Sequence, residues 1–207
     1  MKKIGLLFTL LLFSLAVQAQ NTTLKQIENK VASLKIFKAS VVFSTQGAKG
    51  DAASYNGEMF VKGKYYSIHF GQMEIFSDGE TIWTYTPSRS EVIIEKASTR
   101  NGIMSSPTSF LSVSERDFSV LSNGTMRIGN TSYKTITLSP KGTEVAKSVT
   151  NVVVAYQANY IPKKVIITTK DNLKISILLN KVTLLSFMTD AAFTFDTSKA
   201  KEIIDFR

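Results

Sequence analysis

The segment from Met73 to Lys96 constrains the fold more than any other part of the sequence. It reads MEIFSDGETIWTYTPSRSEVIIEK, three short apolar runs separated by two turn signals. The pair Asp78-Gly79 is a strong hairpin signal and predicts a two-residue type I′ turn, because glycine accepts the positive φ that this turn requires. Pro87 favours a second turn, since its ring fixes φ. The segment therefore predicts three successive antiparallel strands.

Two large rings lie close together on the middle strand of this segment. Side chains alternate between the faces of a strand, so Trp83 and Tyr85 share one face and Ile82 and Thr84 share the other. Such a pair of rings usually packs in a protein core and less often lines a ligand cavity. Both interpretations are consistent with the sequence.

Short β-type segments fill most of the remaining chain. Runs rich in Val, Ile, Thr and Tyr, with turn residues such as Asn123-Gly124 between them, predict strands over residues 39–46, 54–62, 65–70, 117–121, 125–128, 132–139, 149–156, 162–169, 173–179 and 182–187. Many short strands at this spacing are typical of one large curved sheet or a barrel. The sequence thus predicts a mainly β protein.

Two segments depart from this pattern. Residues 21–37 carry apolar side chains at spacings of three and four, which predicts an amphipathic helix packed against the sheet; these side chains are Leu24, Ile27, Val31, Leu34 and Phe37. Residues 98–114 show no alternation, and we expect a loop that leads into a short helix beginning near Pro107. The alternative for this second segment is a crossover loop with a few buried anchors.

The N-terminus has the pattern of an export signal. A short basic start is followed by an apolar run from Ile4 to Val17 and a small residue, Ala19, which predicts a signal peptide over residues 1–19 with cleavage before Gln20. We expect residues 20–207 to form one exported domain in the periplasm. The sequence contains no cysteine, so disulfides, thiolate metal sites and thiol catalysis are excluded.

The polar residues give little support for catalysis. His69 is the only histidine, and no partner at a recognisable spacing accompanies it, so a hydrolase that works through His69 is the least favoured function. We expect no enzyme activity, no cofactor and no metal. The formal net charge is +9, or +7 without Lys2 and Lys3, but no basic run is interleaved with aromatic residues, which argues against nucleic acid as a partner. The excess charge serves either solubility or attraction to anionic head groups.

Two motifs resemble one known family. The hairpin SDGETIWTYTP, residues 77–87, and the ending FTFD, residues 193–196, are similar to those of the periplasmic outer-membrane lipoprotein carriers of the LolA type. The resemblance implies a half-open antiparallel β-barrel, a strongly curved sheet covered by an N-terminal helix and a short helical lid. It further implies a monomer that takes acylated lipoproteins from an inner-membrane lipoprotein-releasing ABC transporter and delivers them to an outer-membrane receptor, shielding the acyl chains in an apolar cavity.

The resemblance also assigns positions to the cavity and its lid. Five residues are expected to form the acyl-binding wall, namely Tyr66, Ile68, Phe70, Trp83 and Tyr85, and three are expected in the lid, namely Met104, Phe110 and Leu111.

One family feature is missing from this chain. Familiar carriers have an Arg-Pro pair that latches the lid, whereas this chain has Val61-Lys62-Gly63-Lys64 at the corresponding place. Either a lysine replaces the arginine, without its planar fork, or apolar packing alone holds the lid.

The alternative function is an envelope sensor or scaffold of the same fold that binds a protein or lipid partner without transport.

Overall fold

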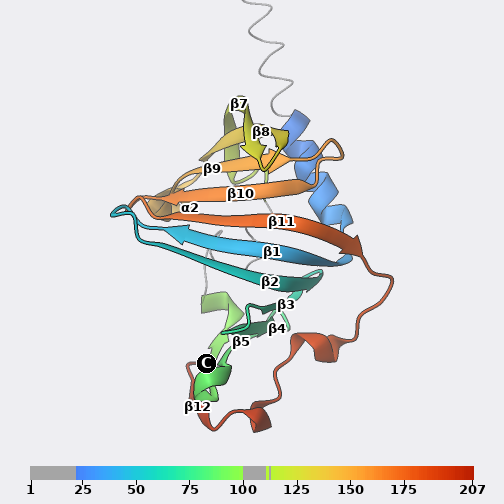
Figure 1. Cartoon of the computed structure of the whole chain (residues 1–207), viewed down its shortest axis with the longest axis vertical. Helices are drawn as coiled ribbons and strands as arrows, with labels where there is room; N and C mark the ends of the chain where they lie inside the picture. The colour runs from blue at the N-terminus through green and yellow to red at the C-terminus, as the bar shows by residue number, and fades with distance from the viewer. Residues whose placement is uncertain (1–21, 100–110, 112) are drawn as a thin grey trace, which may run out of the picture.

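The strands form one large open sheet (Figure 1). The computed structural model describes residues 22–99, 111 and 113–207. Within these residues the sheet has twelve strands in the order β12-β6-β5-β4-β3-β2-β1-β11-β10-β9-β8-β7. Neighbouring strands are antiparallel, except that β12 runs parallel to β6. The sheet does not close, because β12 and β7 remain at its two edges. The predicted mainly β, half-open architecture is therefore confirmed.

The elements follow the chain in two runs of strands. The first run is β1 (Ile36–Gln46), β2 (Ala52–Lys62), β3 (Tyr65–His69), β4 (Glu74–Ser77), β5 (Thr81–Thr86) and β6 (Glu91–Lys96). The second is β7 (Phe118–Ile128), β8 (Thr131–Pro140), β9 (Val149–Tyr156), β10 (Pro162–Thr169) and β11 (Lys174–Leu184), followed by the edge strand β12 (Glu202–Asp205). Helices are short: residues 22–33, α2 (Thr143–Ser148) and the 3-10 turns η1 (Pro87–Arg89), η2 (Ala97–Thr99), η4 (Asp190–Phe193) and η5 (Thr197–Lys199).

The Asp-Gly hairpin forms, but its turn differs from the predicted one. The last cross-strand pair joins Ser77 to Ile82, so the connection is longer than two residues. Gly79 has φ of 81°, whereas Asp78 is not among the non-glycine residues with positive φ. A type I′ turn needs positive φ at both central positions, so that prediction is wrong. Instead, the Asp78 carboxylate accepts hydrogen bonds from the backbone N–H groups of Glu80 (2.9 Å) and Thr81 (2.7 Å).

Two predicted strand breaks lie inside continuous strands. The Asn123-Gly124 pair lies inside β7 and is paired in regular register with Ile136 and Thr135 of β8; the one bulge in this pairing falls just before it, at Leu121. A Cβ atom at Gly124 would lie 3.1 Å from the Thr135 hydroxyl, so the glycine marks a close cross-strand approach rather than a turn. A second bulge, at Asn180, interrupts the pairing of β1 with β11 without ending either strand.

The inner face of the sheet, defined here as the face that carries helix 22–33, holds the main core. Leu24 and Ile27 of this helix are buried against side chains that alternate along the central strands, such as Ile136, Val154 and Val165. The helix was predicted to reach Phe37 but ends at residue 33, because Ile36 and Phe37 pair with β2 and begin β1. The amphipathic helix therefore covers one face of the sheet, as its spacing predicts.

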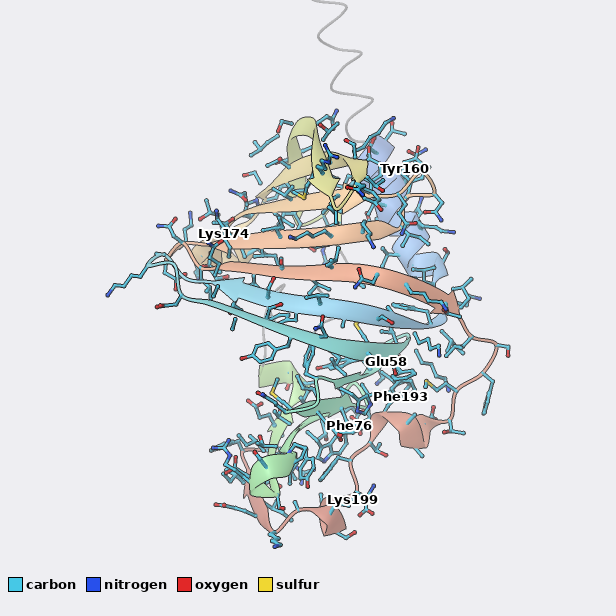
Figure 2. The ribbon with its side chains drawn as sticks, in the orientation of Figure 1. Glu58, Phe76, Tyr160, Lys174, Phe193 and Lys199 are labelled. Carbon is cyan, nitrogen blue, oxygen red and sulfur yellow. The ribbon has the colours of Figure 1, made fainter. Side chains whose placement is uncertain are left out.

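The outer face is covered along one half by the C-terminal segment, residues 186–201. This segment crosses from β11 to the far edge of the sheet and then pairs as β12 with β6 (Figure 1). Phe193 is fully buried and stacks on Tyr65 with ring centroids 5.9 Å apart. Phe195 packs against Tyr85 at 4.6 Å and Phe76 at 5.7 Å. Figure 2 labels Phe76 on the sheet and Phe193 on the crossing segment.

Several predicted segments lie outside the described residues. These are the signal peptide, residues 1–19, and most of the predicted lid, including Met104 and Phe110. Leu111, the third predicted lid residue, is described and is 2% exposed in the inner core. No helix in the described part of the chain has the length and apolar character needed to span a bilayer.

The last residues of the chain hold an exposed ion pair whose titration is testable. The Arg207 guanidinium donates to the Asp205 carboxylate at 2.7 Å and lowers the pKa of Asp205 from 3.8 to about 2. A lowered pKa in the folded state means that this contribution to stability is present at neutral pH and is lost as pH falls from 3.8 through about 2. We expect NMR titration to show Asp205 charged down to about pH 2, and the Arg207→Gln substitution to return its pKa toward 3.8. An unchanged Asp205 titration in that variant would contradict the assigned cause.

Candidate functional site

An apolar cavity opens on the inner face near one end of β1, β2 and β3. Its volume is about 310 Å³. Nine of its ten lining side chains are apolar or aromatic and the tenth is a neutral amide; they are Val41, Phe43, Tyr55, Met59, Ile68, Phe70, Gln72, Met73, Ile75 and Ile177. The volume falls at the lower end of the range of about 300–1,000 Å³ for small-molecule pockets. This composition suits an apolar chain.

Three aromatic rings and one glycine shape the cavity. Phe70 lies between Phe43 and Tyr55, with ring centroids 5.9 Å and 6.3 Å away. Gly57 lies on the neighbouring strand, where a Cβ atom would come within 2.7 Å of the Phe70 ring and 2.4 Å of the His69 carbonyl oxygen. Real Cβ atoms do not approach so closely, so only glycine lets the end of β3 and the Phe70 ring close onto β2.

The structure brings together only part of the predicted acyl-binding wall. Ile68 and Phe70 both line the cavity. Tyr66 lies on the same face and is 2% exposed, but it belongs to the neighbouring core rather than to the cavity lining.

Trp83 and Tyr85 lie on the opposite face of the sheet. The register pairs Phe76 with Trp83 and Ile75 with Thr84, so Thr84 shares the inner face with the cavity residue Ile75, and Trp83 does not. Trp83 and Tyr85 pack instead in the outer cluster with Phe195. The prediction that they share a wall with Ile68 is therefore wrong. Alternation shows which side chains share a face but not which face is the inner one. Which face of β5 is inner depends on the register of β3 with β4 and of β4 with β5.

Most of the cavity lining was not predicted. Met59, Met73 and Ile75 belong to the strands and turn that flank β3, whereas Val41 and Ile177 come from β1 and β11. The alternation of Val41 with Phe43 was a usable signal for one face of β1. Nothing local indicates that β1 pairs with β11, because the two strands lie far apart in the sequence.

His69 lies on the outer face, on the other side of the sheet from the cavity. Its Nδ1 atom is 3.8 Å from Glu74 Oε1, and its ring makes edge contacts with Phe60 and Phe76 at 6.0 Å and 5.4 Å. Ser67 and His69 both line a shallow outer-face depression of about 780 Å³, but among the described residues no hydrogen bond joins the two side chains. The surroundings of His69 are those of a partly exposed ring in an aromatic cluster.

Lys62, which stands in the stretch where familiar carriers have Arg-Pro, contacts the C-terminal segment. Its Nζ atom donates to Asp190 Oδ1 at 2.7 Å and to the Met188 carbonyl oxygen at 3.1 Å. Lys64 lies 3.9 Å from Glu80 and 5.7 Å from the ring centre of Tyr65. In the described structure Lys62 therefore contacts the C-terminal segment, and Lys64 contacts the neighbouring hairpin of the sheet.

A wider cleft of about 770 Å³ lies near the other end of β1 and β2, beside helix 22–33. Leu34, Phe37 and Leu111 give it an apolar floor, and Arg116 and Asp117 lie on its rim. The Arg116 guanidinium hydrogen-bonds Asp117 and thereby holds the pKa of that carboxyl below its usual range. Of these two depressions on the inner face, the smaller is the more apolar.

The fold recurs in solved structures with low sequence identity. An uncharacterized conserved protein from Thermus thermophilus matches with a TM-score of 0.55 and 9% identity, over 87% of this chain and 98% of that one. The LolA superfamily protein NE2245 from Nitrosomonas europaea matches with a TM-score of 0.43 and 16% identity, over 83% and 97%. The lipoprotein LppX from Mycobacterium tuberculosis matches with a TM-score of 0.44 and 13% identity, over 83% and 99%.

Family membership follows from the sequence match. No curated protein matches this chain. The family of the outer membrane lipoprotein carrier protein LolA, however, matches over residues 68–196, from the end of β3 to the FTFD ending. Because this match spans more than half of the sequence, the chain belongs to the family of the outer membrane lipoprotein carrier protein LolA.

Proposed function

We propose that this protein is a non-enzymatic periplasmic carrier that shields the acyl chains of lipoproteins between the inner and the outer membrane. It would be exported with its first 19 residues removed, accept its cargo from an inner-membrane lipoprotein-releasing ABC transporter and deliver it to an outer-membrane receptor. The observation that carries the proposal is the apolar cavity of about 310 Å³ on the inner face of a member of this family.

The energetics explain why such a cavity is needed. Each methylene group exposed to water costs ~0.8 kcal/mol, so a sixteen-carbon acyl chain costs on the order of 12 kcal/mol. A lining of Phe, Ile, Val and Met offsets this cost without directional contacts. Met59 and Met73 are flexible and adapt to chains of different shape. A reversible carrier benefits from such adaptable contacts, because the chain must also leave.

The substitution Met73→Glu tests the cavity. Met73 is only partly buried, so the protein should fold, but the new carboxylate would face apolar side chains and its desolvation would oppose binding. We expect the dissociation constant of a fluorescent acyl probe, measured by titration, to rise at least about tenfold, which corresponds to about 1.4 kcal/mol.

Met126→Glu is the matched control. Met126 is also partly buried but lies on β7, away from the cavity, and this variant should bind the probe as the unaltered protein does. Equal probe binding by the two variants would contradict the assignment of the cavity. An unaltered protein that does not bind any acyl probe would contradict the carrier function itself.

A further inference from the structure

The connection that leaves β11 has an unusual composition for a loop. It reads Leu184-Leu185-Ser186-Phe187-Met188, and we call these five residues the apolar tip. The Leu184 side chain is 63% exposed and the Phe187 side chain is 71% exposed. Single exposed apolar residues are common on protein surfaces, but two within four positions, in a segment whose one polar member is Ser186, form a local patch of the kind that marks interaction sites.

The apolar tip is held at the end of the sheet by contacts on both sides of Phe187. Before it, the Leu185 N–H donates to the Ile36 carbonyl oxygen at 3.0 Å. After it, Lys62 donates to the Met188 carbonyl oxygen at 3.1 Å and pairs with Asp190 at 2.7 Å. Figure 1 shows the connection leaving the sheet beside the end of helix 22–33 and running toward η4. The tip is therefore anchored at the end of the sheet through Ile36 and Lys62, two residues that also line the wider cleft.

The surroundings of the apolar tip are basic. Lys35 precedes β1, Lys38 is opposite Thr183, and Lys181 is opposite Ser40. All three lysines are exposed, and in the part of the chain that the structure describes none of them forms an ion pair. Two acidic residues lie in the same region. Asp190 is paired with Lys62, and Glu58 and Lys181 lie on the two strands that flank Ser40. The exposed side chains nearest the tip thus carry a positive surplus.

We propose that the apolar tip docks the protein onto a bilayer that contains anionic lipids. Leu184 and Phe187 enter the boundary between head groups and acyl chains, while Lys35, Lys38 and Lys181 contact the head groups. Apolar side chains beside lysines are the combination that binds such interfaces, because burial and charge attraction add. Docking goes beyond the carrier function and does not require that the cavity bind a chain. It would orient the wider cleft, lined in part by Ile36 and Phe37, toward the membrane.

Vesicle flotation with the purified protein tests the docking surface. We expect binding to phosphatidylcholine vesicles that contain phosphatidylglycerol, and little binding to phosphatidylcholine alone. The double variant Leu184→Ser/Phe187→Ser should lower the partition coefficient at least about tenfold. Lys38→Gln and Lys181→Gln should each lower it about fivefold at low salt, and added salt should weaken binding of the unaltered protein.

The matched control is Leu121→Ser. Leu121 is 60% exposed on the edge strand β7, which β10, β9 and β8 separate from β11, and its loss should leave binding unchanged. The proposal is wrong if Leu121→Ser reduces binding as much as the double variant, if neutral vesicles bind equally well, or if no vesicle binds. It is also wrong if sedimentation shows a dimer that the double variant loses, since the patch would then join two copies. Probe uptake in vesicle-free solution, measured in parallel, reports on the carrier function separately.

Discussion

Replacing Phe193 with alanine is expected to lower the free energy of unfolding by about 3–5 kcal/mol, the usual cost of removing a buried phenylalanine. Phe193 is completely buried and stacks on Tyr65, so truncation leaves a cavity between the C-terminal segment and β3. Chemical denaturation, with the unfolding midpoint read from intrinsic fluorescence and circular dichroism, measures the change. The Lys62–Asp190 contact alone would not compensate, because both partners are partly exposed.

Phe187→Ala provides the control in the same segment. Its ring is 71% exposed, so we expect a change within about 0.5 kcal/mol. If Phe193→Ala proved as mild as Phe187→Ala, the C-terminal segment would not be packed on the outer face as described. A stable Phe187→Ala protein would also show that any loss of membrane binding on substitution at this position does not come from unfolding.

The second large effect is expected at Gly57. Gly57→Val should destabilise the protein by about 1–3 kcal/mol, because the added atoms cannot be accommodated without moving the backbone of β3. The first of these atoms, Cβ, would meet the His69 carbonyl oxygen at 2.4 Å and the Phe70 ring at 2.7 Å. Any relaxation that relieves the contact displaces Phe70 from the cavity wall. We therefore expect weaker binding of an acyl probe together with a lower unfolding midpoint.

Gly47→Ala separates this steric effect from the general effect of replacing a glycine. At Gly47 the nearest atom would be 3.7 Å from the new Cβ, an ordinary contact, and its φ is not positive. We expect unfolding and probe binding close to those of the unaltered protein. Equal destabilisation by both substitutions would show that the close approach of β2 to the end of β3 is not required for the cavity.

The sequence predicted the type of most elements because their signals are local. Alternation and turn residues place β9 and β10 at their observed bounds, Val149–Tyr156 and Pro162–Thr169. The same signals misplace Asn123-Gly124, which lies in regular register within β7 rather than in a turn. Residues such as Asn and Gly favour a turn conformation of the backbone. Whether a strand continues through them depends on its partner strand, which the local sequence does not show.

The candidate site was less predictable than the fold, for a related reason. Ile68 and Phe70 could be assigned to a face because they alternate within one strand. The positions of Trp83 and Tyr85 depended on which face the C-terminal segment would cover, and Phe195 settles this by packing on Tyr85. The contribution of Ile177 required knowing that β11 pairs with β1 in the middle of the sheet. Cavities assembled by such distant pairings leave no trace in any single stretch of sequence.

The pairing of β1 with β11 has a consequence for how the chain matures. Strands β2 to β6 can pair in sequence, each with the next, before the rest of the chain is available. One edge of β1 has no partner strand until residues 174–184 form β11. The β6 edge stays open even longer, until residues 202–205 add β12. Open edges of this kind invite pairing with other chains. The open edges therefore persist until almost the entire chain is available for folding, so protection of the unfinished sheet by chaperones matters most at this late stage.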